Sequence, residues 1–279
     1  MSAGEATLKR AGESGPSFDD SWFVKKNIRS ILVVVAVLAV FIVSSIICNF
    51  DLVYAVTSIP AAFEWLFANF HPIASSFAEF PSIVSETVST ALDSVAATVL
   101  SAILGIAFAV LGSSTVGVEF APVRGLIRAV ASIFRNIPMI AWALLLLLSF
   151  KQNEFTGFLA LFLTTIGQLL RFFLDTFDEI QTGPIEALRS CGASYWQVVF
   201  QGALPLAIAD LMSWMLYMVE TNIRSATLIG LLTGTGIGFS FQIYYNSMRY
   251  DCAGLVVLVT IVFVLLIEFV SNHARRSML

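Results

Sequence analysis

Long uncharged stretches recur along the chain and alternate with short polar segments. The first, at residues 31–48, contains eighteen uncharged residues, which form about 27 Å of helix at a rise of 1.5 Å per residue. That length just crosses the hydrocarbon core of a membrane. Later apolar stretches predict five further spans, at residues 90–111, 127–150, 157–174, 205–220 and 254–270.

Two of the later stretches have additional features. The stretch 90–111 is rich in alanine, serine and glycine, and such small residues allow helices to pack closely in a bilayer. The stretch 127–150 is interrupted by Arg135, Asn136 and Pro138. We expect it to form one span that contains these residues.

The first ninety residues also contain two segments that are not spans. Residues 1–30 are predicted to be a flexible cytoplasmic tail, because the first 24 are rich in Gly, Ser, Glu and Asp. Residues 49–89 carry three prolines and many aromatic side chains, which favour the membrane interface. We predict an extracytoplasmic interfacial segment there, with either a short helix from Pro60 to Phe70 or an ordinary loop. The stretch 31–48 is interpreted as a retained first helix, because no small-x-small cleavage site follows it.

The composition excludes most classes of soluble protein. Hydrophobic residues make up 58% of the 279 residues, charged residues only 12%, and the mean hydropathy is +0.87. A soluble protein carries roughly 25% charged residues, and a soluble domain has too little interior to hide so much apolar side chain. The net charge of −4 provides no basic face for nucleic acid. The sequence therefore predicts an all-α, multi-pass membrane protein with about six transmembrane helices.

Residues that usually carry catalysis or bind metal are sparse. The three cysteines lie far apart without a Cys-x-x-Cys pair, and His71 is distant from His273. A membrane enzyme needs a clustered nucleophile and base, or a metal set, within its spans, so this class is disfavoured and no catalytic or metal-binding residue is predicted. The glycine-rich stretch 230–238 lacks the Lys-Ser/Thr of a P-loop. It is predicted to permit tight, irregular backbone instead.

The basic residues predict the orientation. If the N-terminus is cytoplasmic and the spans alternate, twelve of the fifteen Lys and Arg residues lie at the inner side, as is usual for membrane proteins. Only Lys151, Arg224 and Arg249 then lie toward the outside. Both termini are thus predicted to be cytoplasmic, and so is the polar stretch 175–204.

That polar stretch has the most specific pattern. Apolar residues recur at helical spacing between Pro184 and Phe200, but the stretch is too polar to span a membrane. It is predicted to form a pair of short helices at the membrane surface. Gly192 marks the turn after the first helix, and Pro205 opens the next span.

The spacing resembles the EAA loop of ABC importer permeases, EAA–x3–G–x9–I–x–LP. Glu186, Ala187, Gly192, Leu204 and Pro205 match in register. Leu188 stands at the third motif position, and Gly202 replaces the isoleucine. The resemblance implies a segment that couples to a separate ATPase subunit; an amphipathic linker between two spans is the alternative. The coupling residues expected on this basis are Glu186, Ala187, Leu188, Arg189, Gly192, Ala193, Tyr195, Leu204 and Pro205.

Three further segments resemble the phosphonate-type ABC permeases. The run from Arg135 to Pro138, followed by Trp142-Ala143-Leu144-Leu145, is similar to RxIPxxxWALL. The run from Glu220 to Thr227, followed by residues 234–238, is similar to ExNIRSAT…GxGxGIG, with Thr235 in place of a glycine. Thr165, Gly167 and Arg171 resemble an HTAGxLGK-like segment, with Thr164 where histidine is expected and Arg171 where lysine is expected.

This resemblance, which covers roughly residues 50–271, implies the remaining assignments. A core at residues 90–279 is expected to adopt the type I ABC importer permease fold in the cytoplasmic membrane. Two copies are expected to pair in a homodimer, with two ATPase subunits that bind ATP and Mg, an extracytoplasmic substrate-binding protein and membrane lipid. The chain itself is expected to bind no cofactor. The substrate implied is phosphonate or a related phosphorus oxyanion, such as phosphite or phosphate; a stand-alone transporter or channel is the alternative.

Polar residues in the spans are candidates for the substrate pathway, because a charged side chain at the centre of a membrane helix costs at least about 2.5–3.5 kcal/mol. Glu220 and Arg224 are spaced to pair on one helix face, and the fork of Arg224 suits the oxygens of a phosphonate. A purely structural Glu220–Arg224 pair and snorkelling of Arg135 are open alternatives. The candidates are Arg135, Asn136, Thr164, Thr165, Glu220, Asn222, Arg224, Ser225 and Thr227.

Overall fold

The computed structural model describes residues 20–118 and 120–278, and every element assigned in these ranges is a helix. Most of the predicted tail, residues 1–19, lies outside the described residues. The chain divides into two compact units, Met1–Trp65 and Leu66–Leu279.

The first unit contains α2 (Asp20–Ile47) and most of α3 (Leu52–Asn69). Helix α2 starts within the segment predicted to be a tail, and its part Ser30–Ile47 is long and apolar enough to cross a membrane. Helix α3 starts eight residues before Pro60, which therefore lies inside the helix and not at its first turn. The reason is a cap: Asp51 Oδ1 accepts a hydrogen bond from the Tyr54 amide at 2.9 Å, which fixes an earlier helix start.

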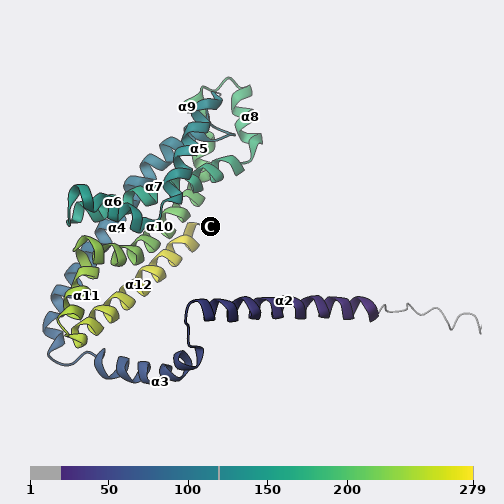
Figure 1. The fold of residues 1–279 in the computed structure, drawn as a ribbon. Coiled ribbons are helices and arrows are strands. Elements are labelled where there is room, and N and C mark those ends of the chain that lie inside the picture. The colour runs from purple at the N-terminus through teal and green to yellow at the C-terminus, as the bar shows by residue number, and fades with distance from the viewer. Residues whose placement is uncertain (1–19, 119, 279) are drawn as a thin grey trace, which may run out of the picture. The chain divides into compact units, whose positions relative to one another are not determined.

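Four long helices form the centre of the second unit (Figure 1). They are α4 (Phe80–Gly112), preceded by the 3₁₀ turn η1 (Ser76–Glu79), and α7 (Glu154–Glu179), α10 (Leu204–Thr233) and α12 (Tyr250–Met278). Together with α2, five helices are long and apolar enough to cross a membrane, or six if one bent helix pair is counted as a span. The predicted all-α class with about six membrane helices is confirmed.

Helix α7 is central, because it packs against α4, α10, α5 (Ala121–Asn136) and α6 (Met139–Phe150). The small residues of α4 allow this approach: a Cβ added at Gly105 would lie 3.2 Å from the ring of Phe173 on α7. Thr87, Ser94 and Thr98 of α4 are buried, and each donates a hydrogen bond to the carbonyl four residues earlier. Their hydroxyls are thus satisfied without water.

The span predicted over residues 127–150 is not one helix. Helices α5 and α6 meet at an angle of 89°. Ile137 is extended, with φ −84° and ψ 119°, because the ring of the following Pro138 disfavours helical backbone at the preceding residue. The predicted span is therefore a bent pair of helices, and Arg135 and Asn136 lie at the end of α5, beside a right-angle bend.

Helix α10 extends 13 residues beyond the span predicted to end at Glu220. It stops at Gly234, which adopts the left-handed conformation (φ 70°) and donates its amide to the Gly230 carbonyl at 3.0 Å. The chain then turns sharply into α11 (Gly236–Asn246). Gly236 also has positive φ (62°), which confirms the tight backbone predicted for residues 230–238.

Candidate functional site

The segment that resembles the EAA loop forms a helix pair at one end of the second unit (Figure 1). Helix α8 (Thr182–Ser190) ends in a turn at Gly192, whose φ of 82° suits glycine. Helix α9 (Tyr195–Gln197) continues through the π turn η2 (Val198–Ala203) into α10. The helix pair and the glycine turn are therefore present as predicted.

Pro205 lies at the start of α10, as predicted, but no break in the helical path precedes it. It lies in an unbroken helical path that starts at Tyr195. A proline inside a helix cannot donate its amide and clashes with the carbonyl four residues earlier. The π turn precedes Pro205, and there the Leu204 amide bonds the Val199 carbonyl five residues back. This wider turn makes room for the proline ring.

The predicted coupling residues fall into two sets. One set packs inward: Leu188, Ala193, Tyr195 and Leu204 are partly buried against the cluster that contains the fully buried Ile185. The other set faces outward and is exposed: Glu186, Ala187, Arg189, Gly192 and Pro205. We call this second set the outer coupling face.

The two departures from the EAA spacing contact each other. A Cβ added at Gly202 would lie 2.7 Å from Leu188 Cδ1 and 3.3 Å from Ile185 Cδ1. Leu188, which is larger than the alanine of the motif, therefore fills the space that an isoleucine at position 202 would occupy. The packing between α8 and the π turn explains why the two positions deviate together.

Placing the motif isoleucine at position 202 tests whether the large residue at 188 and the small residue at 202 compensate each other. Gly202→Ile alone is expected to overpack the contact and lower stability by about 1–3 kcal/mol. Gly202→Ile with Leu188→Ala is expected to recover most of that loss, since residues in contact do not add independently. The melting temperatures of the purified variants in detergent measure the effect. Stability losses that add strictly in the double variant would show that the two positions do not compensate each other.

A polar network fixes the chain after α4 to α5 and α7. Asp178 Oδ1 accepts hydrogen bonds from the Ser113 hydroxyl (2.8 Å) and the Ser114 amide (2.6 Å), and Asp178 Oδ2 pairs with Arg128 Nη2 at 2.6 Å. Arg128 Nε also donates to the Gly112 carbonyl (3.2 Å). Sequence reasoning missed this network, because its members lie up to 65 residues apart.

The helix pair is joined to the same region. Arg189 Nη2 donates to the Thr115 carbonyl at 3.2 Å, and the Tyr195 hydroxyl donates to the Val110 carbonyl at 3.3 Å. The hydroxyl of Thr115 in turn donates to the Asp178 carbonyl (3.2 Å). The helix pair is therefore joined to the end of α4 and the segment that follows it by hydrogen bonds as well as by packing.

The candidate pathway residues of α10 lie in the middle of that helix. Glu220 Oε1 pairs with Arg224 Nη2 at 3.1 Å, as the spacing predicted. Glu220 Oε2 pairs with Arg275 Nη2 of α12, also at 3.1 Å, a contact that sequence reasoning missed. The prediction that Arg224 lies outside while Arg275 lies inside is wrong, because one carboxylate holds both. The cause is the length of α10, which continues past Glu220 and packs against α12.

The other pathway candidates do not join this cluster. Asn222 is buried and donates to the hydroxyls of Thr98 (2.9 Å) and Thr165 (2.8 Å), so it links α10 to α4 and α7. Thr164 is buried and donates to the Ala160 carbonyl. Ser225 and Thr227 are half-buried on α10, whereas Arg135 and Asn136 are exposed at the end of α5.

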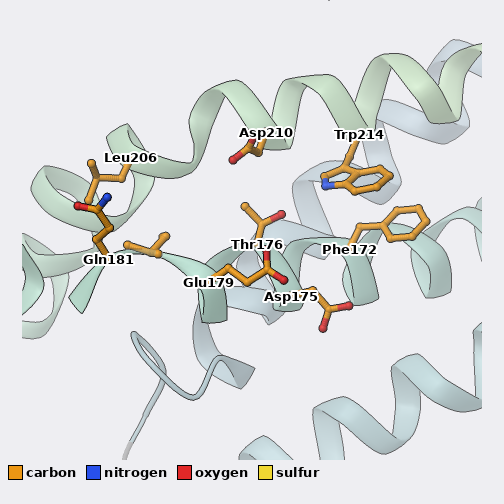
Figure 2. Close-up of a pocket in the computed structure, with 9 residues that line it drawn as sticks. Phe172, Asp175, Thr176, Glu179, Gln181, Leu206, Asp210 and Trp214 are labelled. Atoms are coloured by element: carbon orange, nitrogen blue, oxygen red, sulfur yellow. The ribbon is translucent and has the colours of Figure 1, made fainter. Parts of the chain in front are cut away.

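A cavity of about 730 Å³ opens between the ends of α7 and α10 near the helix pair (Figure 2). Three carboxylates line it, from Asp175, Glu179 and Asp210. Trp214 stacks on Phe172 beside them, with 4.2 Å between ring centroids. This lining does not suit an anion, and no pattern in the sequence predicted the cavity. We call it the acidic cavity.

The acidic cavity shares a helix face with Arg224. Leu206, Asp210 and Trp214 line it from α10 at intervals of four residues. Residues three or four apart lie on the same face of a helix, and steps of three or four residues continue through Tyr217 and Thr221 to Arg224. One face of α10 therefore carries the Asp210 carboxylate near the helix pair and an arginine farther along.

Curated relatives of the chain are permeases. It is 27% identical over 226 residues to the phosphate-import permease protein PhnE of Mycolicibacterium smegmatis, which covers 78% of this chain but only 42% of that protein. It is 25% identical to the phosphite transport system permease protein PtxC of Stutzerimonas stutzeri, over 66% of this chain and 68% of PtxC. It is 32% identical to PhnE2 of Escherichia coli, named for a cryptic phosphonate transport system, over 42% of this chain and 97% of PhnE2.

The fold is that of type I ABC importer permeases, as predicted. A chain of the MetNI methionine ABC transporter in an inward-facing conformation matches with a TM-score of 0.64 at 20% identity, over 74% of this chain and 99% of that one. The family of binding-protein-dependent transport system inner membrane components matches residues 103–278, a range that includes the helix pair, Glu220 and Arg275. The chain therefore belongs to this family of multi-pass inner membrane permeases.

Proposed function

We propose that the chain is the transmembrane subunit of an ATP-driven importer for phosphonate or a related phosphorus oxyanion. The names of its relatives, which refer to phosphate, phosphite and phosphonate, support this substrate class. The phosphonate-type segments around Arg135 and Glu220 favour phosphonate. Phosphite and phosphate are the second candidates.

The outer coupling face is the observation that carries the proposal. Its residues are exposed, while the neighbouring Leu188 and Tyr195 are anchored in the core and Arg189 is bonded to the Thr115 carbonyl. An exposed surface whose neighbouring residues are anchored in the core is suited to bind a partner and to follow its movement. We infer that this face docks on a separate ATPase subunit, which binds ATP and Mg, and that this chain hydrolyses no ATP.

The proposed assembly contains two copies of this chain, two ATPase subunits and an extracytoplasmic substrate-binding protein. When the ATPase subunits close on ATP, the two helix pairs approach each other. The motion passes through Arg189, Tyr195 and the Asp178 network to α4, α5 and α7. The central helices then switch the pathway from inward-facing to outward-facing, and substrate enters from the binding protein.

Gly192→Asn tests the docking face. Asparagine tolerates positive φ, and no atom lies within 4 Å of a Cβ added at Gly192, so the turn is expected to persist. The new side chain nevertheless protrudes from the outer coupling face. We expect at least a fivefold loss of substrate-stimulated ATPase activity in the reconstituted complex, with an unchanged melting temperature.

Gly183→Ala is the matched control, because it lies in the same segment and a Cβ there also meets no atom within 4 Å. It is expected to keep wild-type stimulation. Normal stimulation in Gly192→Asn would refute docking through this face. Uptake by the chain purified without an ATPase subunit would instead favour a stand-alone transporter.

A further inference from the structure

Two arginines share one carboxylate in the middle of the second unit. The Glu220 side chain is only 11% exposed, and each of its oxygens pairs with one guanidinium at 3.1 Å, Oε1 with Arg224 and Oε2 with Arg275. Arginine stays protonated in proteins, so the group carries a net charge of +1. Within residues 20–118 and 120–278, no second carboxylate lies within ion-pair distance of either arginine.

The hydrogen-bonding capacity of the group is also unfilled. Arg275 Nε is buried and has no acceptor in the described part of the chain, and neither does the buried hydroxyl of Thr221, the residue after Glu220. A guanidinium has five N–H donors. A buried donor that belongs to a charged group is costly to leave unpaired. The group thus lacks both a negative charge and acceptor atoms.

The group is nevertheless reachable. The Arg224 side chain is 48% exposed and that of Arg275 is 28% exposed. Glu220 holds one nitrogen of each arginine, so a single carboxylate keeps both guanidiniums close to it. The planar fork of an arginine matches the paired oxygens of a phosphate-type anion, whereas a lysine offers only a point charge.

We propose that Arg224 and Arg275 together bind a tetrahedral phosphorus oxyanion, with Glu220 as the residue that positions both guanidiniums. The oxyanion is either the transported substrate or the phosphate of a lipid headgroup. If it is the substrate, the assignment deepens the proposed function and rests on it. Arg275 then belongs to the substrate site, although its sequence position placed it only among the basic residues of the inner side.

The test uses the complex of the full-length chain with its ATPase subunits, purified in neutral detergent. The readouts are the shift in melting temperature with inorganic phosphate and the shift with phosphatidylglycerol. Wild type is expected to respond to at least one. Arg275→Gln is expected to weaken that response at least tenfold in apparent affinity. Arg276→Gln, an exposed neighbour on the same helix turn, is the matched control and is expected to respond like wild type.

Arg275→Lys distinguishes loss of the binding site from loss of the fold. It retains the charge and a partner for Glu220 but lacks the fork, so it is expected to fold and to bind phosphate or lipid several-fold more weakly than wild type. If both Arg275 variants respond to both probes like Arg276→Gln, or if wild type responds to neither, the site is refuted.

Uptake in vesicles of phosphatidylcholine, with the binding protein present, separates the two hypotheses. An Arg275-dependent response to phosphate with raised KM for uptake assigns the substrate as the ligand. If only phosphatidylglycerol gives an Arg275-dependent response, the site binds a lipid phosphate. If wild type in addition transports no phosphorus oxyanion, the proposed function is refuted while the site is kept. Uptake with normal KM in Arg275→Lys, together with unaltered responses, refutes the site and keeps the proposed function.

Discussion

Gly238→Ala is expected to abolish accumulation of folded protein in the membrane. Helices α10 and α11 pack backbone against backbone at this position. A Cβ on Gly238 would overlap the Thr227 carbonyl oxygen and lie 2.8 Å from the Leu231 nitrogen. These are main-chain atoms of α10, which cannot yield without breaking its hydrogen bonds. Gly230 of α10 faces Gly238, and a Cβ added at Gly230 would lie 3.3 Å from Gly238 Cα.

The expected cost is more than about 4 kcal/mol, which is large for one methyl group. The measurement is the fraction of monodisperse protein after detergent extraction, compared with Gly125→Ala. Gly125 lies in the interior of α5, and a Cβ there meets no atom within 4 Å. That control is expected to gain about 0.5–1 kcal/mol. Equal yields of the two variants would refute the backbone contact between α10 and α11.

Asp178→Ala is expected to destabilise the end of the molecule that carries the helix pair and to uncouple it. The substitution removes an ion pair at 2.6 Å and two further hydrogen bonds, from the Ser113 hydroxyl and the Ser114 amide. It leaves Arg128 half-buried without its carboxylate. We expect a loss of about 2–3 kcal/mol, below the value for a fully buried pair because both side chains are partly exposed.

Asp175→Ala is the matched control for this variant. It lies one turn earlier on α7 and forms only an exposed pair with Arg171 at 2.9 Å, worth at most about 0.5 kcal/mol. The melting temperature and the substrate-stimulated ATPase activity are measured together. Asp178→Ala is expected to lower both strongly, and Asp175→Ala is expected to change neither. Loss of stability with full stimulation would show that the network holds the fold without transmitting motion.

Local patterns in the sequence predicted the features that depend on neighbouring residues. Uninterrupted apolar runs identified the long helices, and the spacing from Glu186 to Pro205 identified the helix pair and its glycine turn. The Glu220–Arg224 pair follows from helical spacing alone. Each of these features is decided within a few turns of one helix.

Features that depend on tertiary structure were missed or misjudged. The polar run from Glu220 to Thr227 resembled a helix end, but burial of Asn222 between α4 and α7 keeps it inside α10. The contact of Arg275 with Glu220 joins residues 55 positions apart. The right angle before Pro138 is stabilised by a close approach, since a Cβ on Gly167 of α7 would lie 2.6 Å from the Arg135 nitrogen.

The acidic cavity has a consequence for backflow from the cytoplasm. In the proposed orientation it opens inward, where nucleotides and metabolite phosphates are abundant. A potential that is negative inside drives each elementary charge of an anion outward with about 2.3 kcal/mol per 100 mV. Three carboxylates line its wall, from Asp175, Glu179 and Asp210. Although Asp175 is paired with Arg171, the net negative charge is expected to lower the local concentration of anions by electrostatic repulsion. In the proposed orientation, the acidic cavity is therefore expected to oppose the return of anionic substrate from the cytoplasm.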